Sequence, residues 1–184
     1  MPEGGKRAVF LDRDGTILVD PGFIHRPSAA RLLPGAAEAI RRLNQAGFLV
    51  ITVSNQSGIA RGLYTEADYV AVQRRLVELL ASHDAHLDAA YFCPHLPEVT
   101  GPCACRKPGT KLFLDARAAF DLDLTRSVWV GDRLSDVAPA RALGGRGILV
   151  ETGNGAEHRD QAAALGVTVV ADLLAAADEI VRAH

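Results

Sequence analysis

The sequence predicts a three-layer α/β domain with a parallel sheet at its centre. Short apolar runs alternate with helical stretches along the chain, and the apolar runs contain few polar residues. Continuous apolar runs are typical of strands buried on both faces, as in a parallel sheet. Strands that alternate with helices indicate right-handed crossover connections, with helices on both faces of the sheet. We therefore expect residues 1–184 to form a single Rossmann-like domain.

Six apolar runs are the expected strands. They read AVFLD (8–12), FLVITVSN (48–55), AAYFCP (89–94), SVWVGD (127–132), GILVE (147–151) and TVVA (168–171). Each is short and almost entirely apolar, as expected of strands that are covered on both sides.

Five stretches are the expected helices: residues 34–47, 65–83, 111–120, 135–143 and 172–183. In the first, Gly47 supplies a stop signal after one apolar face. In the second, Thr65 and Asp68 resemble a capping box in which Asp replaces the usual Glu or Gln. The apolar faces of these two helices consist of Ala36, Ile40 and Leu43, and of Tyr69, Val72, Leu76 and Leu80. The glycine-rich pieces 144–147 and 153–155 are interpreted as turns.

Composition excludes several classes of function. The net charge of −2 shows no excess of Lys and Arg, which disfavours a broad nucleic-acid footprint. No apolar run reaches the ~18 residues needed to span a bilayer, and the polar first residues, MPEGGKR, lack the apolar core of a signal peptide. Three cysteines, an odd number, argue against a disulfide framework. We expect a soluble, cytoplasmic monomer that binds neither nucleic acid nor membrane.

Polar residues follow the expected strands at the edge of the sheet where ligands bind. They are Asp12 and Asp14 after the first strand, Ser54 and Asn55 at the end of the second, and Asp132, with Asp136 four residues later, after the fourth. Taken singly, Asp14 before Gly15 is typical of a turn, and Asp136 of a helix N-cap. Taken together, two acidic clusters at one edge would repel each other unless a cation lies between them. Mg²⁺ is the natural candidate for such oxygen ligands.

These residues carry a family resemblance. Asp12-Arg13-Asp14-Gly15-Thr16, Ser54, Lys107, and Gly131-Asp132 with Asp136 resemble the four motifs of the haloacid dehalogenase superfamily, in order. The resemblance covers nearly the whole chain. It implies a five-stranded parallel core with a smaller appended piece, and phosphoryl transfer through an aspartyl-phosphate.

The resemblance also implies a role for each acidic residue. Asp12 is the expected nucleophile and Asp14 the expected general acid and base. Superfamily members that cleave carbon–halogen bonds lack the second Asp, so Asp14 favours a phosphatase. Mg²⁺ is expected on Asp12, on Asp132 and on the backbone carbonyl of Asp14, with Asp136 supporting it from just outside the ligand set.

A narrower resemblance is carried by FLDRDGTI, by SNQSGIARG and by the Cys-x-His…Cys-x-Cys-Arg-Lys-Pro pattern. They resemble the capless D-glycero-D-manno-heptose 1,7-bisphosphate phosphatases, close relatives of the histidinol-phosphate phosphatases. The resemblance implies hydrolysis of the C7 phosphate, a structural zinc, and a cytoplasmic role in supplying activated heptose for bacterial cell-surface polysaccharide. The expected substrate-binding residues are Ser54, Asn55, Gln56, Arg106, Lys107 and Arg133.

The sequence itself supports a site without a cap domain. Only about twenty residues separate Thr16 from the first expected helix. Segments 19–29 and 56–62 and the cysteine loop are therefore expected to form three short walls around an open site. The chain departs from the family at Arg133, where the family carries Lys, and Arg is bulkier and forked.

All three cysteines lie within one short stretch, Phe92 to Gly109. Cys93, His95, Cys103 and Cys105 supply the four ligands that a closed tetrahedral zinc site requires. Three buried thiols or a redox pair are the alternatives. Because Arg106 and Lys107 follow the last cysteine directly, a zinc ion here is expected to orient the phosphate-binding lysine.

The residues leave the substrate open. A heptose bisphosphate is the leading candidate, followed by histidinol phosphate or another small phosphorylated sugar. A zinc-containing binding module that retains a phosphatase scaffold without turnover is the alternative from a different class. The joint presence of Asp12, Asp14, Ser54, Lys107 and Asp132 argues against it, because a binding module needs no nucleophile and no acid/base.

Overall fold

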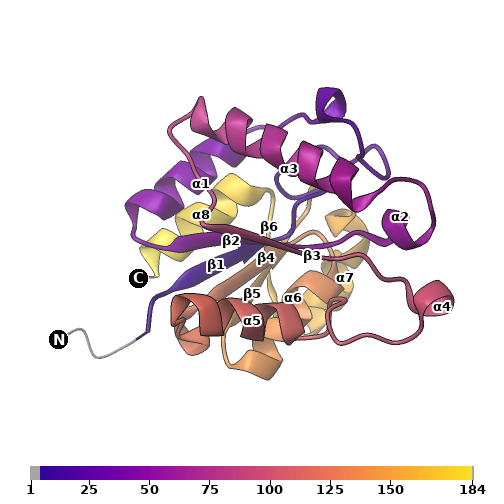
Figure 1. The fold of residues 1–184 in the computed structure, drawn as a ribbon. Coiled ribbons are helices and arrows are strands. Elements are labelled where there is room, and N and C mark those ends of the chain that lie inside the picture. The colour runs from indigo at the N-terminus through magenta and orange to yellow at the C-terminus, as the bar shows by residue number, and fades with distance from the viewer. Residues whose placement is uncertain (1–4, 184) are drawn as a thin grey trace.

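The computed structural model describes residues 5–183, so the first four residues of the polar N-terminal segment and His184 lie outside it. Six strands form one parallel sheet in the order β3-β2-β1-β4-β5-β6 (Figure 1). They are β1 (Ala8–Leu11), β2 (Leu49–Asn55), β3 (Ala89–Cys93), β4 (Val128–Gly131), β5 (Arg146–Val150) and β6 (Thr168–Val170). All six predicted strands are confirmed. The sheet has one strand more than the five-stranded core implied by the family resemblance.

Helices connect the strands and cover both faces of the sheet, which confirms the three-layer prediction. The helices are α1 (Ala36–Gln45), α2 (Ser57–Ala60), α3 (Glu66–Ala81), α4 (Pro97–Thr100), α5 (Lys111–Phe120), α6 (Leu134–Leu143), α7 (Gly155–Ala164) and α8 (Leu173–Arg182). Short 3-10 turns lie at Pro27–Ala29 and Leu124–Arg126.

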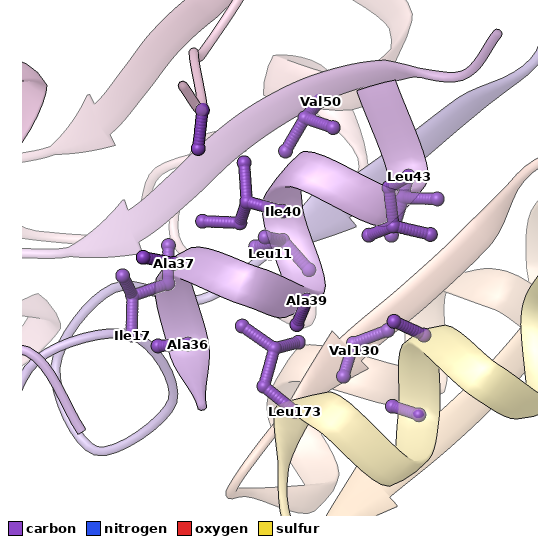
Figure 2. Close-up of a cluster of buried hydrophobic side chains, with 14 of the residues drawn as sticks. Leu11, Ile17, Ala36, Ala37, Ala39, Ile40, Leu43, Val50, Val130 and Leu173 are labelled. Carbon is purple, nitrogen blue, oxygen red and sulfur yellow. The ribbon is translucent and has the colours of Figure 1, made fainter. Parts of the chain in front are cut away.

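Alternate residues of the strands point into two separate cores. Val9 and Leu11 of β1 pack with α1, α3 and α8 on one face, whereas Phe10 packs with α5 and α6 on the other. Figure 2 shows the first core, in which Ile40 and Leu43 of α1 point toward the sheet. Both are fully buried, and burial of each such side chain contributes about 1.5–3 kcal/mol. The two cores fix the sheet, and the sheet fixes the residues at its carboxyl edge.

Local signals for α1 and α3 are confirmed. Gly47, directly after the C-cap of α1, has a φ of 79°, a conformation that favours glycine. At the start of α3, the Thr65 side chain accepts from the backbone N–H of Asp68, and the Asp68 carboxylate accepts from the backbone N–H of Thr65. The predicted capping box therefore forms with Asp at the position usually held by Glu.

Helix α7 was not predicted. Its sequence, GAEHRDQAAA, buries only Gly155 and Ala162, so it has no apolar stripe of helical period. The glycine-rich piece at 153–155, interpreted as a turn, leads directly into this helix.

The segment between β1 and α1 holds no cap domain. Residues 12–35 are all described and contain one 3-10 turn besides bends and isolated bridges. The carboxyl edge of the sheet is therefore bordered by loops, as predicted. Among residues 5–183, no helix combines the length and apolarity needed to cross a membrane.

Candidate active site

Three carboxylates meet at the carboxyl edge of the sheet. Strands β1 and β4 are parallel neighbours with Leu11 paired to Val130, so Asp12 and Asp132 leave the sheet side by side. Asp136 reaches the same place from the first turn of α6. One carboxylate oxygen of each residue lies within 4.8 Å of those of the other two, as at a shared metal ion. Asp14 lies outside this set of side chains, and the contribution of its backbone carbonyl to a metal site stays a prediction.

Of the two carboxylate oxygens of Asp132, only one accepts hydrogen bonds from the described residues. Its Oδ2 accepts from the backbone N–H and the side-chain amide of Asn154, at 2.8 and 3.0 Å. A Cβ on Gly15 or Gly153 would lie 2.5 or 2.3 Å from the same Oδ2, so both glycines are required for the close approach. Oδ1 is buried and has no hydrogen-bond partner among residues 5–183. A buried carboxylate oxygen without a donor is suited to a hard cation, so these residues fit Mg²⁺.

The electrostatics of the acidic edge point the same way. Burial and the neighbouring Asp136 raise the pKa of Asp12 to about 7, against the opposing effect of Lys107. Burial and Asp12 raise the pKa of Asp132 to about 6. A divalent cation would relieve this repulsion and favour the ionised form of both groups.

Lys107 supplies a buried positive charge to this edge. Its side chain is 2% exposed, and its Nζ lies 2.8 Å from Asp12 Oδ1, 2.8 Å from Asp136 Oδ1 and 2.6 Å from the carbonyl oxygen of Val53. Burial lowers the pKa of Lys107, but Asp12 and Asp136 raise it by more, so the net pKa is raised and the group stays an ammonium. Asn55 holds the backbone of Lys107 on both sides, because Oδ1 accepts from its N–H and Nδ2 donates to its carbonyl.

The environment of Asp14 differs from that of the other three carboxylates. The Arg13 guanidinium donates to both of its oxygens, from Nε to Oδ1 at 2.8 Å and from Nη2 to Oδ2 at 3.0 Å. Gln56 Nε2 also donates to Oδ2, at 2.9 Å. Burial lowers the pKa of Arg13, but the Asp14 carboxylate raises it by more, so the net pKa is raised.

Gln56 is 2% exposed, and its side-chain amide already has protein partners. Besides Asp14, its Nε2 donates to Ser54 Oγ at 2.6 Å, and its Oε1 accepts from the Tyr64 hydroxyl at 2.5 Å. The predicted substrate residues Asn55 and Gln56 thus use their amide groups on neighbouring protein atoms. Their direct contact with a substrate stays a prediction.

A cavity of about 420 Å³ opens over these groups, within the usual range for a small-molecule site. All three predicted walls contribute to it: segment 19–29 through Phe23, segment 56–62 through Arg61, and the cysteine loop through Arg106. Arg133 and Ser135 also line it. A hollow of about 480 Å³ between α1 and α8 is lined by residues such as Arg42 and Asp178 and lacks a comparable set of buried polar groups.

The four predicted zinc ligands meet at one point. Cys93 Sγ lies 3.0 Å from Cys105 Sγ and 3.7 Å from Cys103 Sγ, while His95 Nδ1 lies 3.6 Å from Cys93 Sγ and 3.1 Å from Cys105 Sγ. These distances exceed the ~2 Å of a disulfide. They approach the roughly 3.8 Å sulfur–sulfur edge of a tetrahedron around zinc with bonds of about 2.3 Å. The donor set therefore fits zinc.

The alternatives for the cysteines are less compatible with this geometry. Burial raises the pKa of the Cys93 thiol to about 12. Burial also raises the pKa of Cys103, but hydrogen bonds from the Arg106 backbone and from the other two cysteines lower it by more, so its net pKa is lowered. The sulfur atoms lie too far apart for a disulfide. Three unrelated buried thiols would not bring a histidine nitrogen into the same cluster. The cluster also touches the cavity wall, because Arg106 Nη1 donates to the carbonyl of His95 at 3.3 Å.

Three polar residues that hydrogen-bond to Asp14, Gln56 or Asp132 had no predicted role. They are Arg13, Tyr64 and Asn154. Arg13 lies inside a recognised motif but carries no periodic signal that it is buried. Asn154 lies in the glycine-rich piece interpreted as a turn. Tyr64 lies directly before the α3 capping box, and nothing in the sequence distinguishes it from an aromatic residue of the core.

A parallel sheet with paired carboxylates, a buried lysine and a serine at its carboxyl edge defines a haloacid-dehalogenase-like hydrolase. A family model described as "HAD-hyrolase-like" matches residues 104–177. The chain is 48% identical over 157 residues to D-glycero-D-manno-heptose-1,7-bisphosphate 7-phosphatase of Thermosynechococcus vestitus, covering 80% of each chain. It is 43% identical over 152 residues to D-glycero-beta-D-manno-heptose-1,7-bisphosphate 7-phosphatase of Escherichia coli O6:H1, covering 79% of this chain and 80% of the relative.

A solved structure extends the likeness to the whole fold. The D,D-heptose 1,7-bisphosphate phosphatase from B. bronchiseptica, complexed with magnesium and phosphate, superposes with a TM-score of 0.88 at 37% identity, covering 97% of this chain and 99% of that one. The chain belongs to the family of D-glycero-D-manno-heptose 1,7-bisphosphate 7-phosphatases.

Proposed function

We propose that this protein hydrolyses the C7 phosphate of D-glycero-D-manno-heptose 1,7-bisphosphate through an aspartyl-phosphate on Asp12. The observation that carries the proposal is the placing of Asp12 and Asp14, two residues apart, on one cavity. Asp12 is paired with a buried ammonium, whereas Asp14 is held separately by Arg13. One carboxylate can then attack phosphorus while the other handles protons.

The reaction proceeds in two displacements. First, an oxygen of Asp12 forms a bond to phosphorus while the bond between phosphorus and the sugar oxygen breaks. The departing sugar oxygen takes a proton from Asp14. Second, water gives a proton to Asp14 as its oxygen bonds to phosphorus, and the Asp12–phosphorus bond breaks to release inorganic phosphate. Asp12 and Asp14 thereby return to their starting states.

Lys107 and Ser54 bind the oxygens of the transferring phosphoryl group. The Nζ of Lys107 lies beside the nucleophile, and both residues line the cavity. Asp12, Asp132 and the backbone carbonyl of Asp14 hold Mg²⁺, with Asp136 supporting them through Lys107. When bound, this ion would neutralise charge on the phosphoryl oxygens and offset repulsion between the carboxylates.

Cys93, His95, Cys103 and Cys105 hold one structural zinc ion. Four protein ligands leave no open position for water, so the zinc ion takes no part in hydrolysis. Its role is to order the loop that leads into Arg106 and Lys107.

The cavity rim is suited to a second phosphate. Arg61, Arg106 and Arg133 line the same cavity as the buried Lys107, so cationic groups remain for an anion at the far end of the substrate. Arg106 offers a forked guanidinium, which can donate two parallel hydrogen bonds to a phosphate. A bisphosphate is therefore preferred to the matching monophosphate.

The test compares kcat/KM for heptose 1,7-bisphosphate and histidinol phosphate in the wild type and in Arg106→Ala. We expect the wild type to favour the bisphosphate and Arg106→Ala to lose most of that preference. Arg74→Ala removes an exposed arginine outside the cavity lining and is the matched control. Faster turnover of histidinol phosphate by the wild type would reject the heptose assignment.

The chain acts as a single domain and a monomer in the cytoplasm, without nucleic-acid or membrane partners. The net charge of −2 supports the first exclusion. The elution volume of purified protein on size-exclusion chromatography tests the monomer.

A further inference from the structure

Arg13 is a charged residue in an unusual place. It lies between the two catalytic candidates in the chain, yet it is fully buried. Its guanidinium rests over the ring of Tyr69, 4.9 Å from the ring centroid. Its backbone carbonyl accepts from the N–H groups of Ile17 and Leu18, both at 2.9 Å. The side chain and the peptide of Arg13 are thus both fixed, and the guanidinium fork faces the Asp14 carboxylate.

Gln56, which lies between β2 and α2, donates to the same carboxylate. Its Nε2 has two hydrogens, and these go to Asp14 Oδ2 and Ser54 Oγ. The Tyr64 hydroxyl donates to Oε1. A flipped amide would place its oxygen against the Asp14 carboxylate, which only accepts hydrogen bonds when ionised, so Asp14 determines which end of the amide faces it.

The hydrogen bonds on Asp14 leave little freedom. A carboxylate offers about four lone-pair positions, two on each oxygen. On Oδ2, both are taken by Arg13 Nη2 and Gln56 Nε2; on Oδ1, one is taken by Arg13 Nε. One position remains, on Oδ1. The side chain of Asp14 is 19% exposed and lines the cavity, so a substrate can reach this carboxylate.

We propose that Arg13 and Gln56 are positioning residues that leave Oδ1 of Asp14 as the oxygen that exchanges the proton. This inference rests on the proposed function, in which Asp14 is the acid and base. Oδ1 gives its proton to the sugar oxygen as the phosphorus–oxygen bond breaks, and takes one from water in the second displacement. A small displacement of the Asp14 carboxylate would strongly slow this proton transfer, because the rate depends on the exact placing of the reacting groups.

A purely structural role for the ion pair between Arg13 and Asp14 would have a different consequence for activity. If Arg13 only stabilised the fold, its loss would slow the hydrolysis of every phosphate ester by the same factor. If it positions the acid, the loss depends on the leaving group. A sugar alkoxide needs a proton as it departs, whereas p-nitrophenolate is stable without one.

The experiment measures kcat/KM for heptose 1,7-bisphosphate and for p-nitrophenyl phosphate in Arg13→Met, Arg13→Lys and the wild type. For each substrate, kcat/KM reports the steps up to formation of the aspartyl-phosphate. We expect Arg13→Met to lose about 10²-fold or more with the sugar phosphate, and less than about tenfold with the aryl phosphate. Arg13→Lys should behave like Arg13→Met, because one ammonium cannot hold both oxygens.

Gln73→Met is the matched control. Gln73 lies on the same helix as Tyr69, is buried, and donates to Thr52 rather than to Asp14. It should leave the ratio between the two substrates unchanged. If Arg13→Met fails to fold by thermal melting, Gln56→Met removes one hydrogen bond from Oδ2 and makes the same comparison, with the same direction expected.

Equal losses on both substrates, or full activity of Arg13→Lys, would overturn the positioning role. A wild type that hydrolyses p-nitrophenyl phosphate and other sugar phosphates but not the heptose bisphosphate would overturn only the proposed substrate, since any sugar phosphate supplies the alkyl leaving group. A wild type without phosphatase activity would overturn both proposals.

Discussion

The acidic edge and the cysteine loop are two regions that converge on Lys107 by different physical means. At the acidic edge, Asp12 and Asp132 follow neighbouring strands whose backbone pairing already places them side by side. The cysteine loop, by contrast, has one short helix, α4, between residues 94 and 110. Its ligands come from positions separated by up to twelve residues.

The difference shows which parts of the site depend on a metal ion for their shape. The acidic edge exists because of the sheet, and Mg²⁺ would offset a repulsion that the sheet creates. The loop has few backbone hydrogen bonds of its own, so a zinc ion would supply the missing restraint. A structural zinc contributes about 10 kcal/mol or more of binding free energy to such ordering. Removing Mg²⁺ should therefore stop chemistry with the fold intact, whereas removing zinc should loosen one wall.

The largest expected effect is at the acidic edge. Asp12→Asn should abolish turnover and leave the far-ultraviolet circular dichroism spectrum unchanged, because the amide is nearly isosteric but cannot attack phosphorus. The measurement is hydrolysis of p-nitrophenyl phosphate, which needs no particular sugar. Activity close to that of the wild type would exclude Asp12 as the nucleophile.

The next effect is in the cysteine loop. Cys105→Ser should lower the zinc content well below one ion per chain, make residues 93–107 sensitive to protease and reduce activity, without rescue by excess Mg²⁺. Zinc is measured by mass spectrometry on protein purified without chelator. His83→Asn, which changes an exposed histidine outside the cluster, should keep the full zinc content. A zinc-free wild type with full activity would contradict the structural role.

A smaller effect is expected on Mg²⁺ binding alone. Asn154 donates twice to Asp132 Oδ2. Partners that orient a metal ligand typically contribute 10–100-fold to metal affinity. Because its backbone donor remains, Asn154→Ala should weaken Mg²⁺ binding by about tenfold, as measured by calorimetry without substrate. Asn44→Ala is the control. It removes the hydrogen bonds between Asn44 of α1 and the backbone of His86 in the loop before β3, and it should leave the Mg²⁺ affinity unchanged.

The smallest effect is expected where the two regions join. Asn55, at the end of β2, makes two hydrogen bonds to the backbone of Lys107. Each such hydrogen bond contributes about 1 kcal/mol, so Asn55→Ala should lower the free energy of unfolding by about 2 kcal/mol. Denaturation by urea measures this change. If zinc alone positions Lys107, activity at saturating substrate will not fall in this variant.

The sequence predicted the acidic edge well because its signals are local. Strands end where apolar runs end, so the sequence alone assigns Asp12 and Asp132 to one edge of the sheet. The same holds for the zinc ligands, which lie within thirteen consecutive residues. Helix α7 was missed because it buries too little apolar surface to leave a periodic pattern.

The contacts around Asp14 could not be predicted from the sequence. Whether Arg13 points to solvent or packs over the ring of Tyr69 depends on where α3 packs. The sequence pattern of α3 predicts which of its residues are buried, but not which side chains they contact. Gln56 was expected at the substrate, but the hydroxyl of Tyr64 and the carboxylate of Asp14 already occupy its amide. Such assignments depend on the direction of single side chains.

The loops that border the cavity have a consequence for kinetics. In enzymes with lids, lid opening often sets the overall rate. Here the bordering segments are loops that follow the strands, and residues 12–35 contain no lid domain, so product release would not wait for one to open. Asp12 lines this cavity and its side chain is 11% exposed, so water in the cavity would reach the proposed aspartyl-phosphate. Such access suits hydrolysis better than delivery of the phosphoryl group to a second sugar.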